Sequence, residues 1–234
     1  MKMSAERFEK LWARNVAPDG NAWSAAEAYA YLEKQYSQPS RSYHDQTHID
    51  QCLGWLDRYA ETVDDPDAVE LAIWFHDACY LPSPQGHEER SARLFNLMVA
   101  DGMSSAGKEK IIKMIGYTTH SGAPQTSEEA LLVDIDLASF CRPWHQFLID
   151  TVKCRCEKKD IDDLEFCERQ ICFLNGLAAR PHIYFSPPFR KYHEAEAREN
   201  IARILELLEQ RKERLAAMRL EAQQSKPGRH GSGL

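Results

Sequence analysis

The dipeptide His76-Asp77 is the pair of residues in this sequence with the clearest capacity for chemistry. It follows the run Val69-Glu70-Leu71-Ala72-Ile73-Trp74-Phe75, which is apolar at every position except Glu70. Such a run is typical of a protein core, and a carboxylate carried into a core is normally paired or bound to a metal. The adjacent imidazole and carboxylate can offer one nitrogen and one oxygen to the same ion. The dipeptide therefore indicates a metal site that needs further ligands from elsewhere in the chain.

Two other segments supply candidate ligands. Residues 41–49 have the pattern Arg-x-Tyr-His-x-x-x-His-Ile, which places His48 near the start of an expected helix. The segment Asp134-Ile135-Asp136-Leu137 lies in a second, apolar helix. Two residues apart in a helix, Asp134 and Asp136 point about 200° away from each other, so only one of them can face an ion. Spacing alone leaves the choice between them open.

Composition and charge narrow the class of partner. The chain has 234 residues, of which 43% are hydrophobic, and a formal net charge of −7. This acidic balance argues against nucleic acid as the main partner, because nucleic-acid-binding proteins carry a basic face. No apolar run reaches the length of about 18 residues that a membrane-spanning helix needs, and the first residues lack the apolar core of a signal peptide. The odd number of cysteines favours reduced thiols and a cytoplasmic protein.

Helical patterns dominate the sequence and predict an all-α fold. Ser24-x-x-Glu27 is a capping-box pattern that starts a helix ending near Tyr36, and Asp65-Pro66 starts the helix that ends at the His76-Asp77 doublet. Proline-containing segments over 39–42, 81–86 and 180–188 interrupt the helices. The other helices are expected over 4–16, 48–61, 88–100, 108–119, 128–140, 144–156 and 161–177, before a last amphipathic helix with Ile201, Ile204, Leu205 and Leu208 on one face.

The C-terminal part of the sequence differs in character from the rest. We expect a single helical domain over residues 1–210, a charged helical extension over 211–224 and a disordered tail over 225–234. The apolar face of the last helix offers a surface for a homo-oligomer.

Five short patterns follow one another along the chain and together carry a family resemblance. They are Arg-x-Tyr-His-x-x-x-His-Ile from residue 41, Trp-Phe-His-Asp-x-x-Tyr from 74, Glu-Glu-Arg-Ser-Ala from 88, Asp-x-Asp-Leu from 134 and Glu-x-x-x-Arg-x-Asn from 194. The ordered set resembles one branch of the HD superfamily of metal-dependent phosphohydrolases, a branch without a firm physiological substrate. The resemblance spans about residues 7 to 208 and implies an HD-type helical bundle with a metal site between its core helices.

The resemblance also implies a ligand set and an activity. The metal ligands would be His48, His76, Asp77 and Asp136, and Asp134 would hold a ligand histidine or an arginine. Two imidazoles and two carboxylates suit one divalent transition metal among Mn, Fe, Co, Ni and Zn, with Mg as a further candidate. The implied reaction is hydrolysis of a phosphate ester or phosphoanhydride in a small phosphorylated molecule, such as a nucleotide, by metal-activated water.

Three residues near these patterns are candidates for substrate binding, each with a structural alternative. Arg41 could grip a phosphate bidentately, and its alternative is a surface salt bridge. His44 precedes His48 by four residues and could share its helix face, and its alternative is a structural hydrogen bond. His120 ends the helix over 108–119, where a histidine is also favoured by the helix dipole.

Acidic residues are the candidates for catalysis. Asp77 belongs to this set as well as to the ligand set. Glu88 and Glu89 follow the proline-containing segment beside the doublet, and one of them could orient water or protonate the leaving oxygen. Acidic residues also favour helix N-termini for reasons of dipole alone, so a structural explanation stays open for both.

Two other functions fit the same sequence. Some HD proteins hold two irons and oxidise their substrate with O2, using two further histidines between the doublet and the last aspartate. His87 and His120 occupy that interval here, although the closer branch carries asparagine at the position of His87. The other alternative is a non-catalytic binding or regulatory module in which the metal stabilises the fold.

Overall fold

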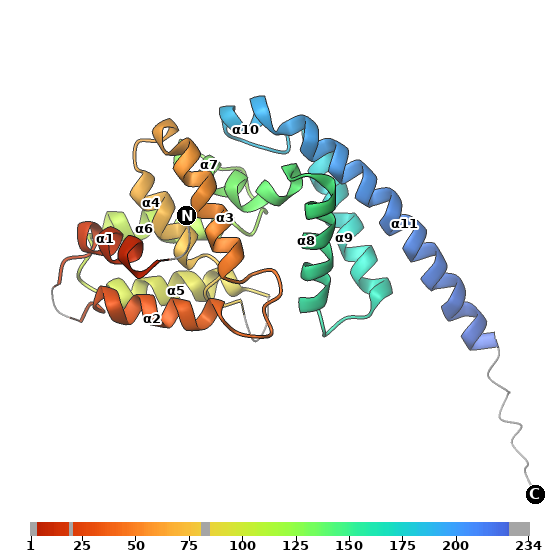
Figure 1. Cartoon of the computed structure of the whole chain (residues 1–234), viewed down its shortest axis with the longest axis horizontal. Helices are drawn as coiled ribbons and strands as arrows, with labels where there is room; N and C mark the ends of the chain where they lie inside the picture. The colour runs from red at the N-terminus through yellow and green to blue at the C-terminus, as the bar shows by residue number, and fades with distance from the viewer. Residues whose placement is uncertain (1–3, 19–20, 81–84, 225–234) are drawn as a thin grey trace, which may run out of the picture.

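The structure is a computed structural model that describes residues 4–18, 21–80 and 85–224. Within these ranges it contains helices and no β-strand, which confirms the all-α prediction (Figure 1). No helix in these ranges is both long and apolar enough to cross a membrane. The elements are α1 (Ala5–Asn15), α2 (Ala25–Tyr36), α3 (Gln46–Tyr59), η1 (Ala60–Thr62), α4 (Pro66–Phe75), α5 (His87–Val99), α6 (Ser105–Tyr117), α7 (Ser127–Asp136), η2 (Leu137–Cys141), α8 (Trp144–Glu157), α9 (Asp163–Ala178), α10 (Pro187–Tyr192) and α11 (Glu194–Gln224), where η marks a 3₁₀ helix.

Local sequence signals set where several helices begin. Ser24 and Glu27 form the predicted capping box at the start of α2. At the start of α3, the side chain of Asp45 accepts the N–H groups of Thr47 and His48. A cap of this kind satisfies backbone donors of the first helical turn and contributes about 1 kcal/mol. The cap of α3 therefore also fixes the turn that carries His48.

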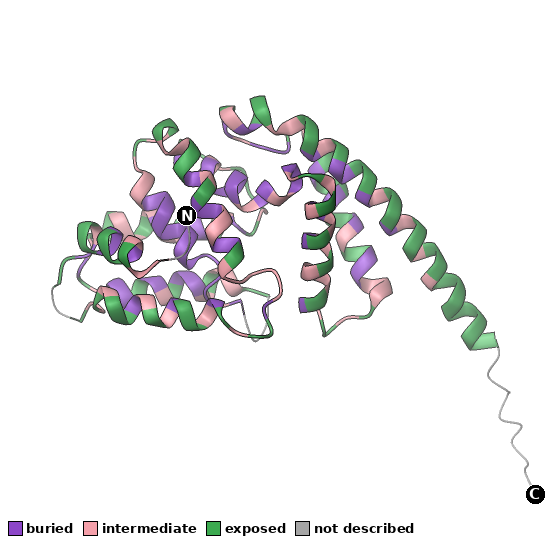
Figure 2. Cartoon of the chain, viewed as in Figure 1, coloured by how far each residue is buried: buried purple, intermediate pink, exposed green. Residues whose placement is uncertain are grey.

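Helix α4 is the centre of the core. Every residue from 68 to 75 is buried, and α4 packs against α1, α3, α5, α6 and α7. Figure 2 shows buried residues concentrated on this helix and its neighbours. The one charged residue of this stretch, Glu70, accepts two hydrogen bonds from the Arg7 guanidinium, at 2.7 and 2.9 Å. Because the whole stretch is buried, it carries His76 and Asp77 into the interior as well.

A second group of helices packs beside this core. Helices α9 and α11 lie side by side, and α11 also contacts α8 and η2 (Figure 1). The first part of α11 buries Ile201, Ile204 and Leu208 of the predicted apolar face, whereas most of its last residues are exposed. The predicted charged extension over 211–224 is thus the end of one continuous helix, and the predicted tail over 225–234 lies outside the described residues.

The helix ends differ from the predicted ones where the candidate ligands lie. Helix α4 ends at Phe75, so His76 is its C-cap and Asp77 lies in the turn that follows. The helix predicted over 128–140 ends at Asp136 and continues as the 3₁₀ helix η2. Both doublet residues and Asp136 therefore lie at the ends of α-helices, where backbone groups without helical partners are held by other contacts.

Candidate metal centre

His76 turns one ring nitrogen, Nε2, towards the centre, and a backbone contact fixes the tautomer of its neutral ring. Its Nδ1 lies 2.9 Å from the carbonyl oxygen of Ile73. A carbonyl oxygen only accepts hydrogen bonds, so Nδ1 carries the proton and donates it. The neutral ring therefore turns an unprotonated Nε2 towards the interior. Metal-binding histidines are commonly held in this way through the ring nitrogen that does not bind the ion.

His48 reaches the same point from α3. Its Nε2 lies 3.2 Å from Nε2 of His76, 3.4 Å from Oδ1 of Asp136 and 3.6 Å from Oδ2 of Asp77. Two ligands at right angles on an ion, each at about 2.1 Å, lie about 3.0 Å apart, so these separations suit a single ion between them. His48, His76 and Asp136 each offer one ligand atom, and these atoms lie within 4.8 Å of one another.

Asp77 adds a buried oxygen that no hydrogen bond satisfies. Its Oδ2 lies 3.0 Å from Nε2 of His76, but within the described chain it has no hydrogen-bond partner. When the His76 ring is neutral, its Nδ1–H donates to Ile73 and Nε2 has no proton to donate to Asp77. Lone pairs that face each other at this range repel unless a cation lies between them. The donor set and the unpartnered oxygen therefore fit a bound metal ion.

The carboxylates make the centre attractive to cations. Burial lowers the pKa of His76, but Asp77 and Asp136 outweigh it and raise that pKa well above its usual value. Burial raises the pKa of Asp136, but hydrogen bonds from the surrounding histidines, His120 first, outweigh it and hold the pKa well below its usual range. A divalent ion would satisfy the same carboxylates without protonating the imidazoles.

The structure resolves the choice between the two aspartates of α7. Asp136 faces the histidines, whereas Asp134 accepts the N–H of Phe185 at 2.8 Å and both the N–H and the hydroxyl of Ser186 at 2.6 Å. The hydrogen bonds of Asp134 therefore anchor the segment before α10 and hold no ligand histidine among the described residues, and the arginine that acts on its charge is Arg190 of α10. Burial raises the pKa of Asp134 to about 7, against the opposing effect of these hydrogen bonds.

Two further histidines contact the outer oxygens of the ligand carboxylates. Nε2 of His87 lies 2.8 Å from Oδ1 of Asp77, and Nε2 of His120 lies 3.0 Å from Oδ2 of Asp136. His120 has a φ of +57°, which is uncommon for a residue other than glycine. Its Nδ1 is buried and has no hydrogen-bond partner among the described residues. Backbone strain of this kind is found most often at functional sites.

Arg41 contacts the backbone around the doublet. Its Nη1 donates to the carbonyl oxygens of His44 and Asp77 at 3.0 and 2.8 Å, and its Nη2 donates to that of Ala78 at 2.9 Å. Both terminal nitrogens of this buried side chain are thus committed to the main chain. We therefore revise the expectation that Arg41 binds a phosphate: it fixes the turn that carries Asp77.

Glu157, at the end of α8, is a residue that the sequence patterns do not mark. Its Oε1 accepts the N–H groups of Ser42, Tyr43 and His44 at 2.6, 2.7 and 3.1 Å, and its Oε2 lies 2.6 Å from Nδ1 of His44. The His44 ring also stacks on Tyr80, with 4.0 Å between ring centres. These contacts lie more than 110 residues away in sequence, so no local spacing could reveal them. The predicted substrate contact of His44 stays a prediction.

The two acidic candidates at the start of α5 have different surroundings. The side chain of Glu88 is largely buried, and its Oε2 lies 3.4 Å from Nδ1 of His87. Glu89 is 71% exposed and pairs with Arg93 on the outer face of the helix. Only Glu88 lies beside the centre, so the predicted role in proton transfer is kept for Glu88 and withdrawn for Glu89.

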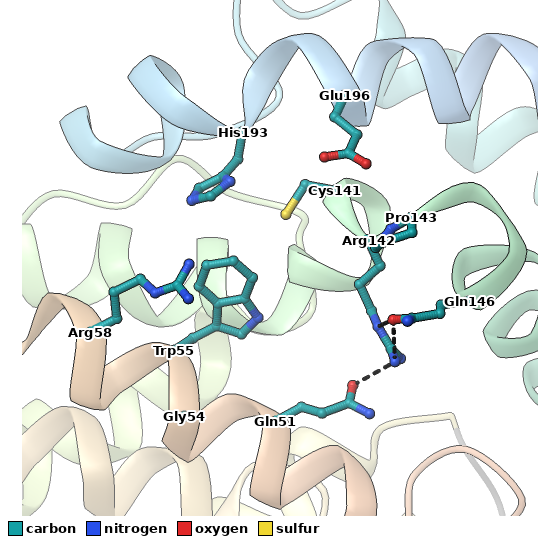
Figure 3. A pocket seen from close by; sticks show the side chains of 10 residues that line it. All are labelled: Gln51, Gly54, Trp55, Arg58, Cys141, Arg142, Pro143, Gln146, His193 and Glu196. Carbon is teal, nitrogen blue, oxygen red and sulfur yellow. Dashed lines mark hydrogen bonds between the residues drawn. The ribbon is translucent and has the colours of Figure 1, made fainter.

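Two cavities lie close to the elements that carry the ligands. One, of about 570 Å³, is lined by His87 and Glu88 on one side and by the α8–α9 turn and α9 on the other. The second, of about 470 Å³, lies between α3, the η2–α8 turn and the start of α11 (Figure 3). Its Arg142 is tied by hydrogen bonds to Gln51 and Gln146. None of the four candidate ligands lines either cavity, and the first adjoins the centre through His87, whose Nε2 lies 2.8 Å from Oδ1 of Asp77.

Comparisons with known proteins give no match, whether to a family model, to a curated protein or to a solved structure. The fold and the site define an all-α protein with a candidate metal centre between α3, α4 and α7. Its function therefore has to be proposed from the residues and their geometry.

Proposed function

We propose that this protein is a metal-dependent hydrolase of a phosphate ester or phosphoanhydride in a small molecule. One observation carries the proposal: ligand atoms of His48, His76 and Asp136 lie within 4.8 Å of one another, and Oδ2 of Asp77, which has no hydrogen-bond partner within the described chain, lies 3.0 Å from Nε2 of His76. Buried carboxylates are normally paired or bound to a metal, and this donor set suits a divalent ion. Phosphorus as the reacting atom comes from the resemblance to the HD branch.

The residues around the ligands support this chemistry. An ion of Mn, Fe, Co, Ni or Zn, or Mg as a further candidate, supplies a Lewis acid when bound and lowers the pKa of water. The Ile73 carbonyl holds the His76 ring, and Arg41 holds the turn of Asp77, so the ligands are preorganised. Glu88 lies at the edge of the adjoining cavity, where a leaving oxygen would need a proton.

Metal content measured together with hydrolysis tests the proposal. Protein stripped with a chelator is reloaded separately with Mn²⁺, Co²⁺, Ni²⁺, Zn²⁺ or Mg²⁺. It is then analysed by mass spectrometry for bound metal and assayed with p-nitrophenyl phosphate and a panel of phosphorylated metabolites. We expect at least one ion per chain and hydrolysis that disappears on chelation. Asp77→Asn should abolish both, whereas Asp101→Asn, at an exposed carboxylate after α5, should change neither. A protein that binds no ion, or hydrolysis that survives chelation, would refute the proposal.

A specific observation favours a second candidate, a centre with two ions. Each ligand carboxylate has one oxygen near the inner histidines and one near an outer histidine, His87 at 2.8 Å and His120 at 3.0 Å. In this candidate, His87 and His120 would hold the second ion together with the carboxylates of Asp77 and Asp136. Two ions per chain, reduced to one by His87→Gln or His120→Gln, would support it. Two redox-active irons with uptake of O2 would favour the oxygenase over the hydrolase.

Two further expectations go with the main proposal. The seven cysteines are all free in the structure, and we propose a reducing, cytoplasmic location for the chain. Exposed Leu207, Met218 and Leu220 on α11 keep a homo-oligomer among the predictions, which size-exclusion chromatography with light scattering can check. Bound metal without any turnover would instead favour the binding or regulatory module.

A further inference from the structure

The cavity beside the centre has a wall that the proposed reaction does not use. Facing His87 and Glu88 are Lys158, which follows α8, and Phe166 and Arg169 of α9. The two sides of the cavity therefore come from the two groups of helices described above. Its volume of about 570 Å³ lies within the range of sites for small metabolites.

Lys158 brings a positive charge to the inner end of this cavity. Its Nζ lies 5.3 Å from the centre of the Tyr80 ring, and that ring lies 5.1 Å from the ring of His87, which contacts Asp77. Arg41 also lies over Tyr80, but its terminal nitrogens are committed to backbone carbonyls. Among the described residues, Lys158 forms no ion pair, so its charge is available to a ligand.

The cavity wall supplies positive charge that the centre lacks. Two neutral imidazoles, two carboxylates and one divalent ion sum to zero, and a first phosphate would be held by the ion itself. A second phosphate group, bound away from the ion, adds close to two negative charges at neutral pH, which nothing in the ligand set offsets. Lys158 offers one compensating charge at the inner end, and Arg169 offers a second, more exposed one that it shares with Glu165.

The remaining wall residues favour hydroxyl groups between the charged ends of a ligand. Glu88 and Asp160 are acceptors, and Gln85 and Gln170 can both donate and accept. The lining therefore contains both cations and acceptors, and it is not uniformly basic. This mixture suits a ligand with separate anionic groups joined by a hydroxylated scaffold.

We propose that this cavity binds a sugar phosphate that carries a second anionic group. The inference rests on the proposed function, because it takes one phosphate to lie at the metal centre. Lys158 and Arg169 hold the second anionic group, and the acceptors of the wall bind the sugar hydroxyls. Hydrogen bonds to a charged group are stronger than those between neutral groups. The second anionic group should therefore increase the affinity of the ligand and favour it over a sugar phosphate with one anionic group.

A matched pair of ligands tests the inference. Glucose 1,6-bisphosphate and glucose 6-phosphate differ by one phosphate, and each is measured by its effect on the thermal midpoint of the metal-loaded protein and by competition with p-nitrophenyl phosphate. We expect wild type to bind the bisphosphate about tenfold more tightly. Lys158→Gln should reduce this ratio below about threefold and leave the affinity for glucose 6-phosphate within about twofold, with a smaller reduction for Arg169→Gln. Lys159→Gln is the matched control, because Lys159 is exposed and does not line the cavity.

The outcomes separate this inference from the proposed function. Metal-loaded protein that hydrolyses p-nitrophenyl phosphate but binds both sugar phosphates equally, or keeps the full ratio in Lys158→Gln, overturns the inference alone. Protein without metal or hydrolysis that still prefers the bisphosphate through Lys158 supports the inference and overturns the hydrolase. Protein that neither reacts with nor binds either ligand overturns both.

Discussion

Asp134 and Asp136 lie two residues apart on α7, and their surroundings are opposite in kind. Asp134 is fully buried and receives hydrogen bonds from donors, namely the N–H of Phe185 and the N–H and hydroxyl of Ser186. Asp136 keeps 15% of its side chain exposed and faces ring nitrogens, one of which, Nε2 of His76, carries no proton when the ring is neutral. The first carboxylate is satisfied by the protein alone, and the second has partners that an ion would satisfy.

The comparison shows that depth of burial does not identify a candidate metal ligand. Asp134 is the more deeply buried of the two, yet its contacts are those of a structural anchor. What distinguishes Asp136 is that its neighbours are ring nitrogens of His48, His76 and His120, which can bind an ion, and not backbone N–H groups. Variants at the two positions should therefore separate loss of function from loss of stability.

The largest expected effect is on metal and activity at Asp136. Asp136→Asn replaces a charged oxygen ligand by a neutral amide, so bound metal should fall from one ion per chain to less than about a tenth. Turnover of p-nitrophenyl phosphate should fall by at least about 100-fold, since even residues that only support metal ligands cost about 10- to 100-fold. Metal analysis and steady-state kinetics on the same preparations measure both.

Asp134→Asn is the matched comparison for that variant. It makes the same chemical change two residues away and should leave bound metal unchanged and activity within about threefold. Equal loss of metal in the two variants would contradict the assignment of Asp136 as a metal ligand and Asp134 as a structural anchor.

The next largest effect is on stability and should appear at Asp134. Asp134→Ala leaves the buried N–H groups of Phe185 and Ser186 without their acceptor, which should cost about 3 kcal/mol of unfolding free energy. Urea denaturation in the presence of a chelator measures this cost without any contribution from metal. A change below about 0.5 kcal/mol would show that the anchor is dispensable.

Metal binding should stabilise the folded chain only when Asp136 is intact, whether or not Asp134 has been changed. At a free ion concentration of 100 times Kd, a ligand that binds only the native state adds about 2.7 kcal/mol. Wild type and Asp134→Asn should both gain thermal stability when Mn²⁺ or Zn²⁺ is added to chelator-treated protein, and Asp136→Asn should gain none. An equal gain in all three proteins would place the ion elsewhere.

The smallest effect concerns Glu157, a third buried carboxylate that resembles Asp134 in being held by donors. Burial raises the pKa of Glu157, but His44 and the N–H groups of residues 43 and 44 outweigh it and hold the pKa below its usual value of 4.5. A depressed pKa means that the folded state favours the charged form. The carboxylate therefore adds stability above its usual pKa and loses that contribution as the pH falls through its lower pKa in the folded state.

Glu157→Gln tests that pH dependence. It should lower the unfolding free energy by about 2 kcal/mol at pH 7 and by much less in acid, where wild type has lost the same contribution. Denaturation curves between pH 3 and pH 7 measure the difference. A penalty that is the same at every pH would mean that packing and not charge makes Glu157 important.

Local signals predicted much of the fold and part of the centre. The capping box of Ser24 and Glu27 starts α2 where expected, and the apolar run before His76 is buried throughout. The structure brings His48, His76 and Asp136 together and places Asp77 beside His76, since an apolar helix that carries a carboxylate inward must also bring its partners. The family pattern selected Asp136, and helical geometry required that Asp134 point elsewhere.

Long-range contacts set the limit of what the sequence could predict. Arg41 fitted a phosphate ligand by type, but the carbonyl oxygens that bind it lie around the doublet, 36 and 37 residues away. Glu157 and Lys158 reach the site only because α8 and α9 pack beside the core, and no spacing rule indicates that placement. Glu88 and Glu89 are neighbours in the sequence and fitted the same catalytic role equally well. Successive residues of a helix face different directions, however, so their surroundings differ.

Anomalous diffraction from crystals of the Mn²⁺-loaded protein would test the central claim most directly. The convergence of His48, His76, Asp77 and Asp136 predicts one strong peak at about 2.0 to 2.3 Å from a nitrogen or oxygen of each of the four side chains. A second peak between the two carboxylates and the outer histidines would favour the two-ion candidate. A map with no peak among these four residues, or with the ion bound at another place, would contradict the metal centre and the hydrolase proposed from it.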